Sequence, residues 1–206
     1  MEQNTQPQDN DYWCWKAEIS HKNCQKIINL SEDNWNLAST FGSAKNKTKG
    51  EEIRKSDIVW ITEQWVYDLI WGYMCEANEN AGWKYDIVAA ESCQITRYTK
   101  GGFYSWHKDG IGSHNTARNL PDNKFLHGNA RKLSMSILLN DDYEGGNFQI
   151  HDNVYDPIKQ GKEVETTVSG EGSVIVFPSF IEHQVAPVTK GIRYSLVTWF
   201  VGPPFV

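Results

Sequence analysis

The sequence is poor in the features that mark several special classes of protein. Its cysteines, Cys14, Cys24, Cys75 and Cys93, form no Cys-x-x-Cys pair, which argues against a zinc ribbon or a disulfide-rich secreted scaffold. No apolar run is long enough to span a bilayer, and the first twelve residues lack the apolar core of a signal peptide. The net charge of -6 offers no general excess of cations to a phosphate backbone. We therefore expect a soluble, cytoplasmic protein that binds neither membranes nor nucleic acid.

The composition is that of a folded domain. Hydrophobic residues make up 39% of the 206 residues, charged residues make up 22%, and nine tryptophans are present. A chain of this length can build a single sizeable core. We expect residues 1–11 to be a flexible N-terminus and residues 12–206 to form one domain.

Two segments in the first half of the chain carry helical patterns. Ser20 precedes the run HKNCQKIINL and can cap its first turn. Further along, a second run has apolar residues at helical spacing: Trp65, Val66, Leu69, Ile70, Tyr73 and Met74. We expect a short helix after Ser20 and a longer one that packs this apolar stripe against a sheet. The hydrophilic stretch Ala44 to Glu52 between them is expected to be a loop.

From Trp83 onward the hydrophobic pattern has a period of two, which indicates strands separated by turn residues. The candidate strands are WKYDIV, SCQITRY, FYSWHKD, KLSMSILL, GNFQIH, GSVIVFP, HQVAPV and RYSLVTWF. Helices followed by many short strands predict an α+β protein. Its strands would close into a two-sheet jelly roll, buttressed on one face by the N-terminal helices.

A histidine and an aspartate stand two positions apart in the segment YTKGGFYSWHKDG, residues 98–110. On a regular strand His107 and Asp109 point to the same face, where an imidazole nitrogen and a carboxylate oxygen can bind one divalent metal ion. A second histidine from a distant strand would complete three ligands. His183 is the best candidate, because it lies between two later strands and a barrel can bring it opposite His107.

A cation, a hydroxyl and an aromatic ring share one face of the last predicted strand. Arg193 is followed by Ser195 at i+2 and Trp199 at i+6, which places all three on the same side. A guanidinium group buried inside a barrel requires an anion, and its planar fork suits a carboxylate. A dicarboxylate co-substrate is a candidate for that anion.

The succession His107-x-Asp109, His183 and Arg193-x-Ser195 resembles the Fe(II)/2-oxoglutarate-dependent dioxygenases over roughly residues 92–200. Within them the chain is similar to the prolyl 4-hydroxylase-like branch, which includes the bacterial PKHD-type hydroxylases. The matching segments are YTKGGFYSWHKD, LLNDDYEGGNFQI and HQVAPVTKGIRYSLVTW. The resemblance implies a double-stranded β-helix, the jelly roll of this family, with the catalytic core at about residues 83–202.

The resemblance also implies roles for individual residues. The residues that would bind Fe(II) at the catalytic centre are His107, Asp109 and His183. The residues that would lie around 2-oxoglutarate are Arg193, Tyr98, Ser195 and Trp199. Arg193 would hold the distal carboxylate, in a position where many prolyl 4-hydroxylases have lysine. Some relatives place a second tyrosine on that carboxylate where this chain has Leu138.

The implied reaction is hydroxylation of an unactivated C–H bond, with succinate and carbon dioxide as co-products and ascorbate as a candidate reductant. A prolyl residue of a protein or peptide is the favoured substrate. One alternative is an oxygenase of a free amino acid or another small metabolite. Repair of alkylated nucleobases is disfavoured, because Trp199 stands where that branch has a second arginine and the chain is acidic. A catalytically silent jelly roll that binds a ligand or partner is the other alternative.

Several further expectations concern the surroundings of this site. The polar stretch Gly110 to Ala130 is predicted to be a mobile loop beside it. Tyr104 and Trp106 differ from His107 in parity, so a regular strand would turn both away from the metal. The remaining histidines of the second half are interpreted as solvated side chains outside the site: His114, His127 and His151.

Overall fold

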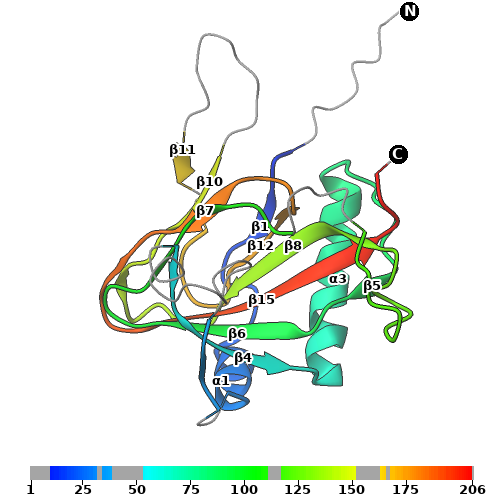
Figure 1. Cartoon of the computed structure of the whole chain (residues 1–206). Coiled ribbons are helices and arrows are strands. Elements are labelled where there is room, and N and C mark those ends of the chain that lie inside the picture. The colour runs from blue at the N-terminus through cyan, green and yellow to red at the C-terminus, as the bar shows by residue number, and fades with distance from the viewer. Residues whose placement is uncertain are drawn as a thin grey trace, which may run out of the picture.

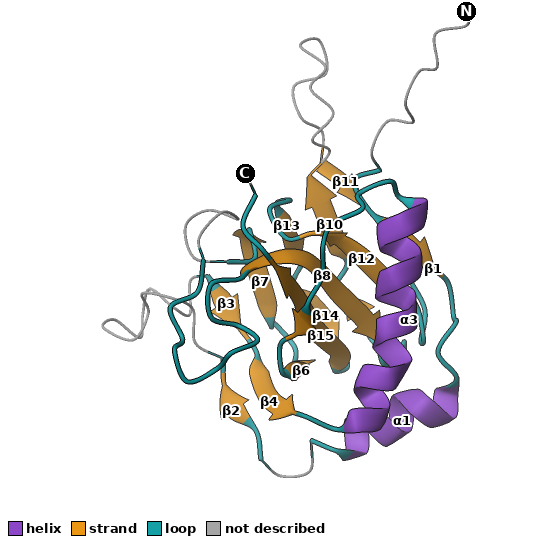
Figure 2. Ribbon diagram, turned by 90° about the vertical axis from the view of Figure 1, so that its right-hand side faces the viewer, coloured by secondary structure: helices purple, strands orange, loops and turns teal. Residues whose placement is uncertain are grey.

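The structure of the protein is a computed structural model that describes residues 10–31, 34–38, 53–110, 117–151, 163–165 and 168–205. Two antiparallel sheets face each other, and the helices lie outside one of them (Figures 1 and 2). This arrangement confirms the predicted α+β fold with a jelly-roll core buttressed by N-terminal helices. The domain limits proposed from the sequence stay a prediction.

The larger sheet forms the wall between the helices and the interior. Its strand order is β1 (Trp13–Trp15), β12 (Val174–Pro178), β8 (Ala130–Leu138), β15 (Arg193–Gly202), β6 (Cys93–Tyr98), β4 (Asp57–Ile61) and β2 (Asn36–Leu37), with β5 (Ala89–Ala90) beside β15. The long central strands β8 and β15 are almost entirely buried because one face meets the helices and the other meets the second sheet.

The smaller sheet closes the other side of the barrel. Its order is β11 (Glu163–Glu165), β10 (Phe148–His151), β13 (His183–Val185), β7 (Phe103–His107) and β3 (Arg54–Lys55). A separate pair, β9 (Glu144–Gly145) and β14 (Val188–Lys190), joins the two sheets at one end. Apolar side chains from both sheets, among them Phe148 and Phe177, fill part of the space between them.

Two helices cover the outer face of the larger sheet (Figure 2). In α1 (His21–Asn29) the Ser20 hydroxyl accepts a hydrogen bond from the Asn23 amide at 3.4 Å, as its position before the run predicted. The longer α3 (Gln64–Asn80) buries Val66, Ile70 and Met74 against the sheet, which is the face that the helical spacing indicated. None of the helices in the described residues is both long enough and apolar enough to cross a membrane.

One predicted strand was wrong. Residues 83–88, WKYDIV, form no strand: Lys84 has a φ of 51°, and its amide donates to the carbonyl of Asn78 at 3.0 Å. Val88 donates to the carbonyl of Val201 at 2.8 Å, just before β5 begins. Trp83 and Ile87 still pack inward while Lys84 lies exposed. Buried and exposed side chains therefore alternate here although the segment belongs to no sheet. The Asn78 side chain holds this segment, because it donates to the carbonyl of Tyr85 and accepts a hydrogen bond from the Tyr85 amide. The predicted loop Ala44 to Glu52 lies outside the described residues.

Gly172 connects the lead-in to α1 with the strand β12. Its carbonyl accepts the amide hydrogens of Glu18 and Ile19, and its amide donates to Leu138. At a φ of 78° it has a left-handed conformation, and an added Cβ would collide with the carbonyl oxygen of Ile19. Gly170 has a similar φ of 91° but open space around it.

We expect Gly172→Ala to lower the free energy of unfolding by roughly 2–4 kcal/mol, because backbone strain and overpacking add. The matched Gly170→Ala carries only the strain, and we expect a cost of about 1–2 kcal/mol. Urea unfolding of both variants measures the difference. Equal losses would show that the contact with Ile19 contributes nothing.

Candidate metal centre and co-substrate pocket

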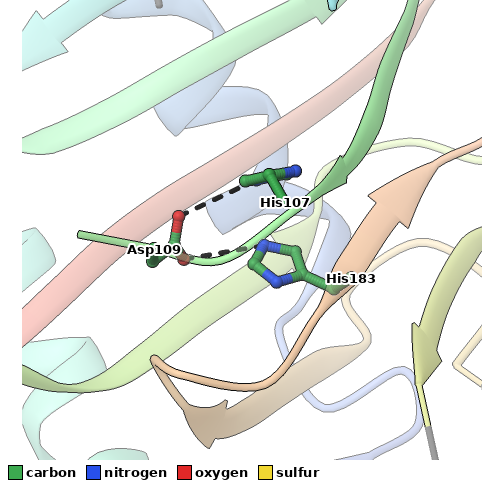
Figure 3. Close-up of side chains that lie close together, drawn as sticks. All are labelled: His107, Asp109 and His183. Carbon is green, nitrogen blue, oxygen red and sulfur yellow. Dashed lines mark ion pairs between the residues drawn. The ribbon is translucent and has the colours of Figure 1, made fainter. Parts of the chain in front are cut away.

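Three side chains that could hold a metal ion meet at one point between the sheets (Figure 3). His107 ends β7, Asp109 follows it, and His183 begins β13 directly opposite His107 in the strand register. The Nε2 atoms of His107 and His183 lie 3.8 and 3.6 Å from the two Asp109 carboxylate oxygens. All the candidate ligand atoms lie within 4.8 Å of one another. Strand pairing thus brings together residues that are far apart in the sequence, as parity and order predicted.

Backbone carbonyls fix the orientation of both imidazoles. His107 Nδ1 donates to the carbonyl oxygen of Ser105 at 2.7 Å, and His183 Nδ1 donates to that of Ile181 at 3.0 Å. Because a carbonyl can only accept, the proton of each neutral ring must sit on Nδ1. Each Nε2 therefore presents its lone pair to the shared centre, which is the tautomer that a metal ion needs.

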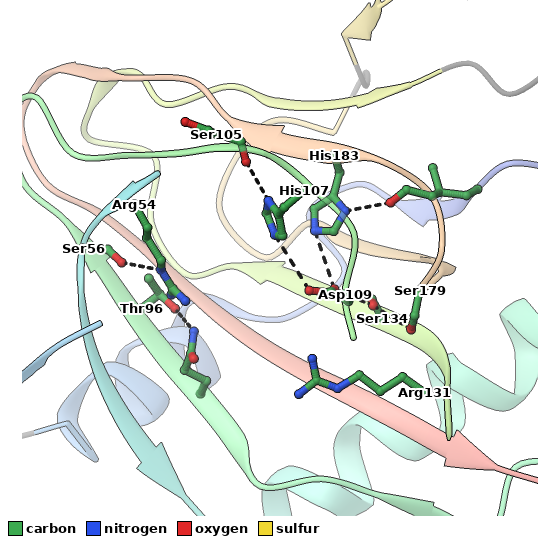
Figure 4. Close-up of polar contacts among 12 residues, drawn as sticks. Arg54, Ser56, Thr96, Ser105, His107, Asp109, Arg131, Ser134, Ser179 and His183 are labelled. Atoms are coloured by element: carbon green, nitrogen blue, oxygen red, sulfur yellow. Dashed lines mark hydrogen bonds and ion pairs between the residues drawn. The ribbon is translucent and has the colours of Figure 1, made fainter. Parts of the chain in front are cut away.

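Asp109 is held by a buried hydroxyl pair. Ser134 Oγ, on β8, donates to Asp109 Oδ2 at 2.6 Å and lies 2.9 Å from Ser179 Oγ (Figure 4). The backbone amide of Asp109 donates to the carbonyl of Ser179 at 3.0 Å. These contacts set the direction of a carboxylate that is 8% exposed.

The electrostatics of the three residues suit a divalent cation. Burial, followed by the charge that His183 would carry, lowers the pKa of His107 to about 3. Burial disfavours the charged form of Asp109, but the neighbouring His183 and His107 outweigh it and bring its pKa to about 2. At neutral pH His107 is therefore neutral and Asp109 is ionised, so neither needs to lose a proton before it binds a metal.

Tyr104 faces the site, because β7 is not the regular strand on which it would point away. The pairing of β7 with β13 shifts register between His183 and Val185: His183 opposes His107, whereas Val185 opposes Tyr104. This bulge adds one residue to β7 and returns Tyr104 to the face of His107. The two rings stack with centroids 3.5 Å apart. Burial raises the pKa of Tyr104 to about 12, so its phenol keeps its proton.

A cavity of about 310 Å³ opens beside the metal-binding residues and contains the predicted face of β15. Arg193, Ser195 and Trp199 all line it, as their parity predicted, and so does Tyr98. The Arg193 side chain is 1% exposed, and its Nη1 donates to Ser195 Oγ at 3.1 Å. Its guanidinium carbon lies 5.4 Å from the centre of the Tyr98 ring.

The rest of the Arg193 guanidinium group has no partner. Its Nε and Nη2 atoms are buried and make no hydrogen bond with the described residues, and Nε1 of Trp199 is in the same state. Leaving such donors unsatisfied is costly, so the cavity is built for a ligand with acceptor oxygens. Leu138, opposite Ser195, is 4% exposed and packs in the apolar cluster between the sheets.

Gly146 leaves room for the stem of Arg193. A Cβ added there would lie 2.9 Å from Arg193 Cδ and 3.0 Å from Val188 Cγ2. Its φ of 66° is also in the left-handed region. The Gly145-Gly146 turn therefore packs against a residue that lines the cavity.

Other residues that line the cavity escaped the sequence analysis. Arg131, at the start of β8, pairs with Glu91 through both guanidinium arms at 2.8 and 2.7 Å and lies 3.8 Å over the Trp199 ring. Arg54 comes from the two-residue strand β3. No periodicity can be read from two residues, so only the folded arrangement shows that Arg54 reaches the site.

The described part of the predicted loop is tied down beside the cavity. Arg118 lines the cavity and pairs with Glu91 at 2.7 Å. His127, an exposed residue, accepts a hydrogen bond from the Leu120 amide and does not line the cavity. Residues 111–116, which include His114, lie outside the described residues. The mobility of this loop stays a prediction.

Comparison with known families agrees with this geometry. The sequence model of the 2OG-Fe(II) oxygenase superfamily matches residues 93–201, which is more than half of the chain. The chain belongs to this superfamily. The matched segment begins at β6 and ends on β15, so it contains the metal-binding triad and the Arg193 face of the cavity.

Among curated proteins the chain is similar to PKHD-type hydroxylases. It is 33% identical over 108 residues to that of Stenotrophomonas maltophilia (strain R551-3), which covers 52% of this chain and 41% of that protein. It is 30% identical over 115 residues to that of Synechococcus sp. (strain CC9605), which covers 55% and 43% respectively. The chain thus spans less than half the length of these two relatives.

Solved structures show the same fold. A Pseudomonas putida prolyl-4-hydroxylase has a TM-score of 0.64 at 19% identity, and covers 92% of this chain and 91% of its own. A prolyl hydroxylase from Trichoplax adhaerens, in complex with a hypoxia inducible factor peptide, has a TM-score of 0.61 at 16% identity, with 93% and 83% covered. At such identities the likeness establishes the architecture and not the substrate.

The residues present fit the two groups in the name of the superfamily. Two imidazole nitrogens and one carboxylate oxygen on one side form the 2-His-1-carboxylate set that suits non-haem Fe(II) and leaves positions open. The unpaired donors of Arg193 suit the distal carboxylate of 2-oxoglutarate. Fe(II) and 2-oxoglutarate are thus the cofactors of this site.

The Ser134 hydroxyl offers a test of how the carboxylate is positioned. Ser134→Ala should weaken Mn(II) binding by about ten- to a hundredfold, because Asp109 loses a buried donor that orients it. Ser136→Ala is the matched control: Ser136 lines the cavity from the same strand and makes no hydrogen bond to Asp109. Calorimetric titration of both metal-free variants with Mn(II) gives the comparison. Similar affinities in the two would contradict the positioning role.

Proposed function

We propose that the protein is an Fe(II)- and 2-oxoglutarate-dependent dioxygenase that hydroxylates an unactivated C–H bond. His107, Asp109 and His183 would hold the metal ion. Arg193 would bind the distal carboxylate of 2-oxoglutarate, with Ser195 beside it. The family supports the reaction class, and the cavity joins the two parts of the site in one space.

The observation that carries this proposal is the buried, unsatisfied guanidinium of Arg193. A structural arginine in a core has a carboxylate partner, because an unpaired buried charge is expensive. Arg193 has only the Ser195 hydroxyl among the described residues, and its free donors lie in a cavity that also contains the metal-binding triad. A keto diacid bridges these two features: one end can chelate the metal and the other can neutralise Arg193.

When bound, iron and 2-oxoglutarate supply the oxidising chemistry: one atom of dioxygen enters the substrate and the other enters succinate as carbon dioxide leaves. The protein's own residues orient the metal-binding side chains and cover them. The carbonyl bonds of His107 and His183 keep both Nε2 lone pairs on the metal side. Ser134 orients Asp109, and the stacked ring of Tyr104 covers one face of His107.

A prolyl residue of a protein or peptide is the proposed substrate. The similarity to PKHD-type hydroxylases and the shared architecture with prolyl hydroxylases, one of them bound to a peptide, support it. Trp60, half exposed at 51%, and Trp199 line the cavity with ring centroids 6.1 Å apart and offer apolar surface to a pyrrolidine ring. Ascorbate would serve as an external reductant of the iron.

A free amino acid or another small metabolite is the alternative substrate, favoured by the modest cavity volume of about 310 Å³. Trp199 still argues against an alkylated nucleobase, because it lines the cavity from the sequence position at which that branch has its second arginine. A silent binding protein is disfavoured because all three metal-binding side chains and Arg193 are present and correctly turned.

The reaction class can be tested with His107→Ala. We expect conversion of 2-oxoglutarate to succinate, with Fe(II) and ascorbate, to fall by at least about a hundredfold, because the metal loses one of three ligands. His21→Ala is the control, since that imidazole lies exposed on α1 and its one partner among the described residues is Glu171. Succinate is quantified by mass spectrometry. Undiminished turnover in the His107 variant would refute the metal assignment.

The proposal of a prolyl substrate is tested by analysing the hydroxylated product. Proline-containing peptides incubated with the loaded enzyme should gain one oxygen on proline, as seen by fragment mass spectrometry, and His107→Ala should abolish the gain. Free amino acids are screened in parallel. Oxygen on a free amino acid and none on any peptide would replace the prolyl substrate with a small metabolite.

A further inference from the structure

The cavity carries more positive charge than the proposed co-substrate requires. Among the described residues, five cationic side chains line it and Asp109 supplies the one carboxylate: Arg54, Lys108, Arg118, Arg131 and Arg193. This local excess contrasts with the net charge of -6 for the whole chain. A cavity of that sign selects anionic ligands.

Most of these cations have an evident partner. Arg118 and Arg131 share the buried carboxylate of Glu91, each at 2.7 Å. Arg193 is assigned to 2-oxoglutarate. Lys108 is exposed and can be neutralised by solvent ions. Arg54 alone remains: it is 8% exposed, and no acidic side chain of the described residues pairs with it.

The contacts of Arg54 with the described residues leave the terminal nitrogens of its guanidinium group free. Its Nε donates to Ser56 Oγ at 2.8 Å (Figure 4), and its guanidinium carbon lies 4.5 Å over the ring of Tyr104. Neither contact uses the terminal nitrogens. Tyr104 in turn stacks on His107, so only one aromatic ring separates the guanidinium from a metal-binding imidazole.

We infer that Arg54 binds a carboxylate of the substrate, so that the enzyme hydroxylates an acid whose reacting C–H bond lies within a few bonds of that group. The inference rests on the proposed function, because it names the substrate class of the same cavity. A planar fork with two free terminal nitrogens suits bidentate pairing with a carboxylate. The carboxylate can belong to a free acid or to an acidic residue in a peptide, since both present the same group.

The co-substrate does not account for Arg54. Arg193 enters the cavity from β15 on the larger sheet, whereas Arg54 enters from β3 on the smaller sheet. On the side of the larger sheet, the free donors of Arg193 and Nε1 of Trp199 are unsatisfied and can take up one anion. On the side of the smaller sheet, Arg54 over the Tyr104 ring offers a place for a second anion.

The test uses protein loaded with Mn(II) and 2-oxoglutarate and two matched pairs of probes. One pair is N-acetyl-L-proline and its amide; the other is a proline peptide with a neighbouring Glu and the same peptide with Gln. Calorimetry measures the affinity of each. We expect the acidic member of at least one pair to bind at least about tenfold more tightly, because only it pairs with the buried cation. The pair that responds identifies the source of the carboxylate.

Variants assign the preference to Arg54. Arg54→Gln should abolish the preference for the acid, and Arg54→Lys should retain part of it because the charge remains. Lys55→Gln removes a neighbouring exposed cation from the same strand and should retain it in full. Thermal melting confirms that the variants are folded. The inference is overturned if the preference for the acid persists in Arg54→Gln. It is also overturned if, in both pairs, the two probes bind the wild type equally or do not bind.

Two further readouts separate this inference from the proposed function. If the wild type forms succinate but does not prefer the acidic probes, the assignment of Arg54 is wrong and the proposed function stands. If it prefers the acidic probes but forms no succinate, the carboxylate site stands and the proposed oxygenase activity is wrong. The affinity for 2-oxoglutarate is compared in Arg54→Gln and Arg193→Gln. An equal fall in both would place the co-substrate at Arg54 and overturn the inference.

Discussion

The antiparallel pairing of β7 with β13 is the constraint on which the site depends. It sets His183 directly against His107, and the bulge in the same ladder turns Tyr104 to the same side. In this pairing the two imidazoles lie close together and share a centre with Asp109. A change of register by one residue would send the side chains to opposite faces and dissolve the site.

The larger sheet and its outer layer of helices carry the other half of the site. Both helices pack on the far side of the larger sheet, and the buried strands β8, β12 and β15 form one continuous wall. The wall contributes Ser134 from β8 and Arg193 from β15, so the same packing that stabilises the domain positions groups of the site. The buried polar groups cost stability that the apolar clusters on both faces of the wall offset.

Sequence patterns predicted the parts of the site that lie on regular strands. Arg193, Ser195 and Trp199 share a face because β15 keeps a strict period of two over those positions. The orientation of Tyr104 could not be predicted, because a bulge leaves no mark in the hydrophobic pattern of a single strand. Arg54 lies on a strand too short to show any period, and residues 83–88 show that alternating burial does not require a paired strand.

Gly146 illustrates how a turn can limit what a binding site tolerates. The absence of a side chain there leaves room for the methylene stem of Arg193, because an added Cβ would lie 2.9 Å from its Cδ. A larger residue would push against this stem and so shift the guanidinium group that the stem carries. A glycine that does not line the cavity can therefore decide where the cation stands within it.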